Sequence, residues 1–443
     1  MSDQTLSPMS SPSSNLLDAW KRLLLNTLTF GVFGALFFQS QKMVGTSWVA
    51  LLAFITVCAR AETRSGMRSI FLYAGQPDLR WIAWPFLLWG LMSGLFFLSS
   101  PVPLEKAYIY NYWQYVFILV LSVLALATVT QANPIGLLWG LVVAALLAAW
   151  HGFYDTVIQG MPRASGLSGF PIRFGNWSMI IAMLLVLFSA LSTQMRVRSR
   201  ICLLALAMLA MFASMASGSR SSLLPLPLLI AMLLIFRKDR FHRWILVIGL
   251  MGTILSGVIL LNSDTLQQKL RLTEIVQDIQ QVKKNNFDTS IGARFGMWEA
   301  AWQMFLRHPF IGIGITGYQP ELKEMITRGE IPTFRPWSHA HSDMLHSMAT
   351  RGIVGLLAYL GIILGPLVFF IRCLRHAIST GDAHQRVHAA AGILTIGSVF
   401  AFGLVSVVIY KSAFNGMTYA LLVCVLAAQL VMARRSETGQ PIR

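Results

Sequence analysis

Residues 337–346 read Trp-Ser-His-Ala-His-Ser-Asp-Met-Leu-His, and residues 351–355 follow as Arg-Gly-Ile-Val-Gly. The stretch ends a long polar segment and opens an apolar one, so it marks the point where the chain enters a membrane helix. Three of the nine histidines fall between positions 339 and 346. Imidazole and carboxylate groups are costly at such a boundary unless they are paired. This stretch is therefore the leading candidate for a functional site.

The composition is that of a membrane protein. Of the 443 residues, 55% are hydrophobic and 12% are charged, whereas a soluble domain carries about 25% charged residues. Apolar runs of about 20 residues recur along the chain, and a run of that length can cross a bilayer as a helix. The four cysteines lie in or beside apolar runs and suggest no disulfide framework. The sequence thus predicts an all-α, polytopic integral membrane protein.

Twelve apolar segments are interpreted as membrane spans. They cover residues 23–39, 43–59, 81–98, 112–130, 135–150, 176–193, 201–216, 221–236, 244–261, 352–371, 388–410 and 413–432. Two of them, 135–150 and 221–236, are short. The second contains Pro225 and Pro227, which favours a bent or partly re-entrant helix.

Lysine and arginine are unevenly distributed between the two sides of these spans. With a cytoplasmic N-terminus, the inner segments hold most of the basic residues and the short outer segments hold few. The net charge of +17 is therefore a topology signal and does not indicate nucleic-acid binding. The expected division is a disordered cytoplasmic tail at 1–22, membrane helices at 23–261, an outer loop at 262–350, membrane helices at 351–432 and a cytoplasmic tail at 433–443.

The outer segment 262–350 is expected to fold as a small cap over the membrane surface. It carries nine basic and nine acidic residues and hence no net charge. Helical spacing of apolar residues predicts helices at 264–284 and 292–307. In the second helix these residues are Phe295, Trp298, Ala301, Trp302 and Phe305.

Four arginines near the outer boundary run against the positive-inside trend, or lie in the outer loop: Arg163, Arg173, Arg220 and Arg294. A guanidinium is planar and permanently charged, so it suits bidentate binding of phosphate oxygens. Each arginine taken alone could instead reach lipid headgroups or pair with an acid. Their shared position near the histidines favours a phosphate site.

The histidine stretch allows three interpretations. His339, His341, Asp343 and His346 have the chemistry of metal ligands, but their spacing is a weak metal signature. They could also be interfacial side chains that hydrogen-bond the loop. A general base or an orienting group is the third interpretation, because imidazole titrates near neutral pH.

The motif favours this third interpretation. From His341 the sequence has His-Ser, nine residues, and then Gly352-Ile-Val-Gly. This resembles the His-[Asn/Ser/Gln]-x9-Gly-x-x-[Gly/Thr/Tyr] motif of O-antigen ligases, which share a superfamily with O-antigen polymerases and protein O-oligosaccharyltransferases. Residues 294–314 are similar to the family's Arg-x-x-x-Trp…Pro-x-x-Gly-x-Gly loop. Residues 219–221 and 171–176 resemble two turns of the same family.

The resemblance implies a metal-independent glycosyltransferase of the GT-C type without a cofactor, in the bacterial inner membrane with a periplasmic active site. The donor would be O-antigen glycan on undecaprenyl diphosphate, and the acceptor would be the lipid A–core saccharide; membrane lipids would surround both. His341 would be the base of an inverting single displacement, with His339 as orienting partner or alternative base. Arg220 and Arg294 would hold the diphosphate, with Arg163 and Arg173 as further candidates.

Two other functions remain open. A polymerase or a protein O-oligosaccharyltransferase of the same superfamily would use the same donor chemistry. A transporter would place charged residues deep within several spans, whereas here the charged residues gather at the outer boundary.

Overall fold

The computed structural model describes residues 78–98, 120–128, 135–192, 194–236, 272–284, 286–410 and 413–438, with isolated residues between 19 and 70 and Trp244. All regular structure in these ranges is helical. The long apolar helices are α4 (Arg80–Leu98), α6 (Ile135–Phe153), α7 (Pro171–Leu191), α8 (Val197–Ala216), α15 (Asp343–Thr380), α16 (Ala383–Val405) and α17 (Ala413–Thr438). Shorter elements are η1 (Tyr154–Ile158), η2 (Gly166–Ser168), η3 (Arg220–Leu223), α9 (Leu226–Ile235), α12 (Leu272–Lys283), α13 (Ser290–Arg307) and α14 (Tyr318–Thr327).

Five helical segments of the described chain are long and apolar enough to cross a membrane. They are Leu137–Ile158, Pro171–Leu191, Val197–Ala216, Asp343–Thr380 and Ala383–Val405. Each contains or overlaps a span predicted from the sequence, so the expectation of a multi-pass helical membrane protein is confirmed. The predicted spans at 23–39, 43–59 and 244–261 lie almost entirely outside the described residues, and the total of twelve stays a prediction.

The predicted span 221–236 is shorter than expected. The structure has the 3-10 turn η3 followed by α9, whose N-cap is Pro225 and which has only ten residues. At about 1.5 Å per residue such a helix covers about 15 Å, half of a hydrocarbon core of about 30 Å. The prolines therefore shorten the α-helical part of this segment, and the bent or partly re-entrant path expected from the sequence stays a prediction.

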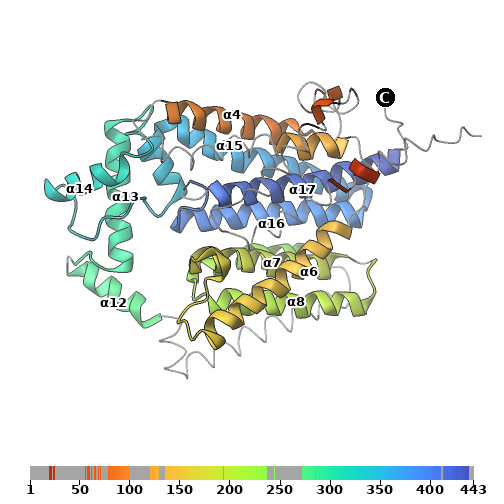
Figure 1. Ribbon diagram of the computed structural model, residues 1–443, viewed down its shortest axis with the longest axis horizontal. Coiled ribbons are helices and arrows are strands. Elements are labelled where there is room, and N and C mark those ends of the chain that lie inside the picture. Colours follow the sequence, from red (N-terminus) through yellow and green to blue (C-terminus); the bar gives the residue numbers. More distant parts are fainter. Residues whose placement is uncertain are drawn as a thin grey trace, which may run out of the picture.

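The long helices form a bundle, and the outer elements lie together at one of its ends (Figure 1). Helix α15 packs against α4 and α16, and α7 packs against α8 and α16. Small residues allow this close packing, as in many membrane bundles. A Cβ on Gly365 of α15 would collide with Pro85 of α4, and one on Gly392 of α16 would collide with Phe370 of α15.

Helices α12, α13 and α14 form the cap at this end. The predicted helix at 292–307 is confirmed as α13, and the one at 264–284 is seen as α12 from residue 272 onward. Helix α14 was not predicted. The cap has its own hydrophobic core, which includes Met297 and Met304 of α13 and Leu322 and Met325 of α14. Of the five apolar residues that carried the prediction of α13, only Ala301 belongs to this core.

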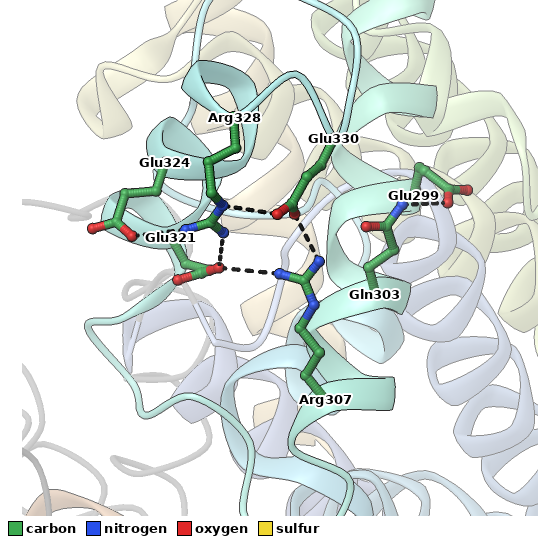
Figure 2. Close-up of polar contacts among 7 residues, drawn as sticks. All are labelled: Glu299, Gln303, Arg307, Glu321, Glu324, Arg328 and Glu330. Carbon is green, nitrogen blue, oxygen red and sulfur yellow. Dashed lines mark hydrogen bonds and ion pairs between the residues drawn. The ribbon is translucent and has the colours of Figure 1, made fainter.

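An ion-pair network ties the end of α13 to α14 (Figure 2). The guanidinium of Arg328 reaches Glu321, Glu324 and Glu330 at 2.8, 3.1 and 2.8 Å, and Arg307 reaches Glu330 at 2.7 Å. Hydrogen bonds from Arg307 and Arg328 hold the pKa of Glu330 below its ordinary value. A single exposed ion pair contributes little to the free energy of unfolding. These pairs instead form a network, in which two arginines contact three carboxylates.

Candidate functional site

The motif glycine Gly352 breaks α15 at the residue where the sequence predicts a membrane span to begin. Its φ is +64° and its ψ is −156°, a conformation essentially restricted to glycine. Because the break exposes backbone groups on both sides, a partner must satisfy them. The loop at 309–314 does so, since Ile313 and Gly314 donate their N–H groups to Ala349 O and Thr350 O at 3.0 and 3.1 Å.

The same loop also accepts hydrogen bonds from the far side of the break. Ile353 N–H donates to Pro309 O at 2.7 Å, and Val354 N–H donates to Phe310 O at 3.5 Å. The fit leaves no spare room, because a Cβ on Gly352 would collide with the Phe310 carbonyl, and one on Gly312 would collide with the Thr350–Arg351 backbone. Two stretches that the sequence analysis singled out separately, 309–314 and 352–355, are therefore one structural unit.

His339 and His341 form a ring pair just before α15. Their ring centroids are 4.2 Å apart, and Trp337 packs edge-on against His341 at 5.6 Å. His339 is buried and lies 3.2 Å from Ser338 Oγ through its Nδ1. His341 is partly exposed and is the one non-glycine residue of the described chain with positive φ, +51°. Such a conformation is uncommon and often marks a functional position, and His341 is the more exposed ring of the pair.

Asp343, two residues after His341, anchors the start of α15. Its side chain is fully buried, and its carboxylate accepts hydrogen bonds from the backbone N–H groups of Val408, Ile409 and Tyr410 at 3.1 to 3.4 Å. From the sequence, Asp343 was a candidate only for a metal ligand. Its contact with residues 408–410 could not be predicted, because these residues are more than sixty positions away along the chain.

Tyr410 and Arg351 complete the anchor. The Tyr410 hydroxyl lies 3.0 Å from Ser347 Oγ and 3.4 Å from the Gly355 carbonyl oxygen. The Arg351 guanidinium stacks over the Tyr410 ring at 4.2 Å and donates to Thr350 Oγ1 at 2.8 Å. Arg351 is buried, and a buried charge needs such partners. The short segment between α16 and α17 is thereby fixed against both sides of the Gly352 break.

His346 lies apart from the histidine pair. It is buried, and its ring packs edge-on against Tyr318 of α14 at 5.3 Å. Burial raises the pKa of Tyr318, whose protonated hydroxyl donates to Met297 O at 2.9 Å. Since the Asp343 carboxylate is directed at backbone N–H groups, the four residues of the metal interpretation do not converge. Within the described residues no group of three His, Cys, Asp or Glu side chains is placed to hold a metal ion.

Arg220 and Arg294 lie close enough for the charge of Arg220 to act on Arg294, although they are 74 positions apart. Arg220 opens η3 at the end of α8, and Arg294 lies in the first turns of α13. Burial and the positive charge of Arg220 lower the pKa of Arg294, while the carboxylate of Asp278 in α12 acts in the opposite direction. Two guanidinium groups that repel each other at a partly exposed boundary form a site suited to an anion.

Arg163 has a different environment from these two arginines. Its Nε donates to Ser217 O at 2.8 Å, and its guanidinium also approaches Gly218 O at 3.4 Å. Gly218 has φ +59°, so the turn between α8 and η3 is tight. Arg163 thus supports the turn that carries Arg220, and the buried Asp155 in turn holds the Arg163 loop through Ser165 N and Gly166 N, both at 2.8 Å.

Arg173 and Asn176 belong to the first turns of α7. The Arg173 guanidinium lies 4.4 Å from the ring centroid of Phe170. The Asn176 amide oxygen accepts a hydrogen bond from Ser221 Oγ at 3.0 Å. The turn at 171–176 and the turn at 219–221, both singled out in the sequence, are therefore in direct contact.

The histidine pair and the arginine pair belong to the same end of the molecule. Ala293, beside Arg294, and Ala340, between the two histidines, are both members of the cap core. Helix α13 packs directly against α15. The cap therefore links the two groups of functional candidates.

Comparison with known proteins finds a family model that matches the part of the chain that carries this site. Residues 203–360 match a family model described as O-antigen ligase. A protein of Haemophilus influenzae described as uncharacterized is 30% identical over 220 residues, which cover 49% of this chain and 54% of that protein, so the match spans about half of either chain. The family segment includes η3, α13, the histidine pair and the Gly352 break. Through this segment, the chain is similar to the O-antigen ligase family.

Proposed function

We propose that the protein is a membrane glycosyltransferase that joins O-antigen glycan from undecaprenyl diphosphate to the lipid A–core of lipopolysaccharide. The proposal is supported by the position of Arg294, which the positive charge of Arg220 influences, on a helix that shares the cap core with the residue between the two histidines. A lipid diphosphate between the arginines would relieve their repulsion, and its sugar would extend toward His341. The site would lie at the periplasmic face of the inner membrane, in a GT-C-type fold.

The chemistry needs no group beyond these side chains. His341 would take the proton of the acceptor hydroxyl as its oxygen attacks the anomeric carbon. The bond from that carbon to the phosphate oxygen would break, and the diphosphate would leave with the bonding electrons. Arg220 and Arg294 would stabilise the negative charge that develops on the phosphate. Attack opposite to the leaving group inverts the configuration of the sugar.

The other residues have supporting roles in this proposal. His339, stacked on His341, would orient its ring. Asp343 and Tyr410 would fix the backbone just after His341, and Arg163 would fix the turn that presents Arg220. Arg173 would lie at the edge of the donor site, because it belongs to the turn that contacts residues 219–221.

The test is a comparison of His341→Ala with His308→Ala in purified protein supplied with lipid-linked donor and core acceptor. His308 is an exposed histidine at the end of α13, so its loss is a matched control. A positioned general base contributes about 10²–10⁴-fold to the rate. We expect His341→Ala to lose transfer by such a factor while donor binding persists, and His308→Ala to transfer normally.

The product distinguishes the related reactions. Core capped by a whole glycan block indicates ligation, a longer glycan on polyprenyl diphosphate indicates polymerisation, and modified protein indicates protein glycosylation. If His341→Ala transfers normally and His339→Ala is inactive, the base is His339.

A further inference from the structure

Helix α13 exposes a continuous apolar arc. Its members recur at spacings of three or four residues and so lie along one side of the helix: Phe295, Trp302 and Leu306 are exposed, and Trp298 and Phe305, at one edge of the arc, are half-buried. Phe295, Trp302 and Leu306 are 48%, 45% and 60% exposed. Neighbouring rings within the arc contact each other, Phe295 with Trp298 and Trp302 with Phe305, both at 5.7 Å. So large an aromatic surface is unusual on a face that meets only water.

The arc is distinct from the two other sides of α13. One side, which includes Met297 and Met304, is buried in the cap core. Another is polar, since Gln303 donates to Glu299 at 2.9 Å and Arg307 joins the ion-pair network (Figure 2). Helix α13 therefore has a buried side, a polar side and an exposed apolar side. The exposed apolar side, which is the arc, does not belong to the core of the described cap.

Continuity with the membrane boundary indicates what covers this surface. The chain leaves α13 into Phe310 and Ile311, which are 73% and 67% exposed. These residues are held beside the residues where the sequence predicts the span 352–371 to begin, because Pro309 O and Phe310 O accept the N–H groups of Ile353 and Val354. The exposed apolar surface thus continues from the cap to the start of a membrane span.

The direction of α13 also indicates that its exposed apolar side meets the membrane surface. Figure 1 shows α13 running across the end of the bundle, at a steep angle to α15 and α16. If the bundle helices cross the membrane, α13 runs along its surface. Helices that lie in the plane of an interface bury a Trp- and Phe-rich face about 5–10 Å into the boundary between headgroups and acyl chains.

We propose that α13 is an interfacial helix and that the arc from Phe295 to Leu306 is immersed in the lipids of the outer leaflet, with Phe310 and Ile311 at the same level. Arg294 precedes the first residue of the arc, so lipid contact along the arc sets the depth of its guanidinium at the headgroup phosphates. The inference concerns the membrane surface and does not depend on the glycosyl transfer reaction.

The experiment compares two neighbouring positions of α13 with opposite expected environments. Trp302→Cys and Gln303→Cys are made in a full-length protein whose four native cysteines are replaced, because adjacent helical residues point about 100° apart. Each is spin-labelled and reconstituted in nanodiscs of phosphatidylethanolamine and phosphatidylglycerol. Power saturation then measures collisions with oxygen, which concentrates in lipid, and with a nickel chelate, which stays in water.

We expect the label at 302 to collide mainly with oxygen and the label at 303 mainly with the nickel chelate. A label at 302 that meets the nickel chelate as often as the label at 303 would show a water-exposed surface and overturn the proposal. A label at 302 shielded from both reagents would also overturn it and indicate a protein partner or a second copy. Both variants must keep the wild-type melting temperature, and Leu306→Cys provides a second lipid-facing position.

Discussion

Replacing Gly352 by alanine tests whether the break in α15 is needed for function. The backbone there has φ +64° and ψ −156°, and holding a non-glycine residue in such a conformation costs about 1–3 kcal/mol. The new Cβ would also collide with the Phe310 carbonyl and lie 2.6 Å from Ile311 N, and relieving such overpacking costs about 1–3 kcal/mol more. The total of about 2–6 kcal/mol is a large part of a typical folding free energy of about 5–15 kcal/mol.

The protein can avoid this cost by releasing the 309–314 loop and reshaping the helix. A cost of at least about 2 kcal/mol lowers the ratio of the intact break to the reshaped helix about 30-fold or more, and transfer falls as the reshaped form becomes dominant. We expect Gly352→Ala to lose most of its transfer activity while the bundle still folds. The assay is the initial rate of glycan transfer in nanodiscs, with the melting temperature measured on the same sample.

Gly361→Ala is the matched control in the same helix. A Cβ at Gly361 would meet only Pro85 Cβ at 3.8 Å, an ordinary contact. Alanine is favoured over glycine within a helix by about 1 kcal/mol, so this variant should transfer normally and melt no lower. Wild-type transfer and melting in Gly352→Ala would refute the reasoning, since the structure allows no side chain at that position.

Further experiments address the anion site, the anchor, the orientation and the metal. Arg220→Lys and Arg294→Lys keep the charge but lose the bidentate fork, so each should raise the donor KM markedly; equal affinity for donor would indicate that the arginines serve only as charges. Asp343→Asn removes the negative charge and leaves one acceptor oxygen for the backbone N–H groups of 408–410; hydrogen bonds to a charged group contribute about 1.5–3 kcal/mol each, so the change should lower both the melting temperature and kcat with little change in donor KM. In intact spheroplasts an impermeant maleimide should label Ser290→Cys, at the start of α13, and spare Ser379→Cys, at the far end of α15; the reverse pattern would place the site in the cytoplasm. Transfer should persist in excess EDTA, and loss of activity that one metal restores would assign the histidines as ligands.

The hydrophobic pattern of the sequence is sufficient to predict the long apolar helices. Long apolar runs such as 176–193 and 201–216 have one dominant explanation, so they correspond to α7 and α8 within a few residues. The pattern was less informative in the cap. Helix α14 was not predicted because its buried face is short, and the buried face of α13 is built largely from alanine and methionine rather than from its aromatic residues.

The candidate site was partly visible in the sequence. Motif spacing indicated His341, Arg220 and Arg294, and their roles stay a prediction; in the structure the charge of Arg220 acts on Arg294. Sequence could not predict the contacts of Asp343 with 408–410, or of Arg163 with the turn at 217–218, because both depend on how distant segments pack. A buried carboxylate at a helix start was the available signal for Asp343, but its partners are backbone N–H groups, which every residue type except proline supplies.

The nine residues between Ser342 and Gly352 are the helical segment of α15 that separates the histidine pair from the break. Ser342 is the N-cap of that segment, and its Oγ accepts the Leu345 N–H. Both ends are bound to other parts of the protein. The length of the segment therefore fixes the distance from His341 to the Gly352 break and the rotation of His341 about the helix axis. One inserted residue would turn His341 by about 100° and move it by about 1.5 Å relative to the membrane boundary. A substitution within the nine positions can be tolerated where its side chain fits, whereas a change in their number misdirects the imidazole whatever residues are present.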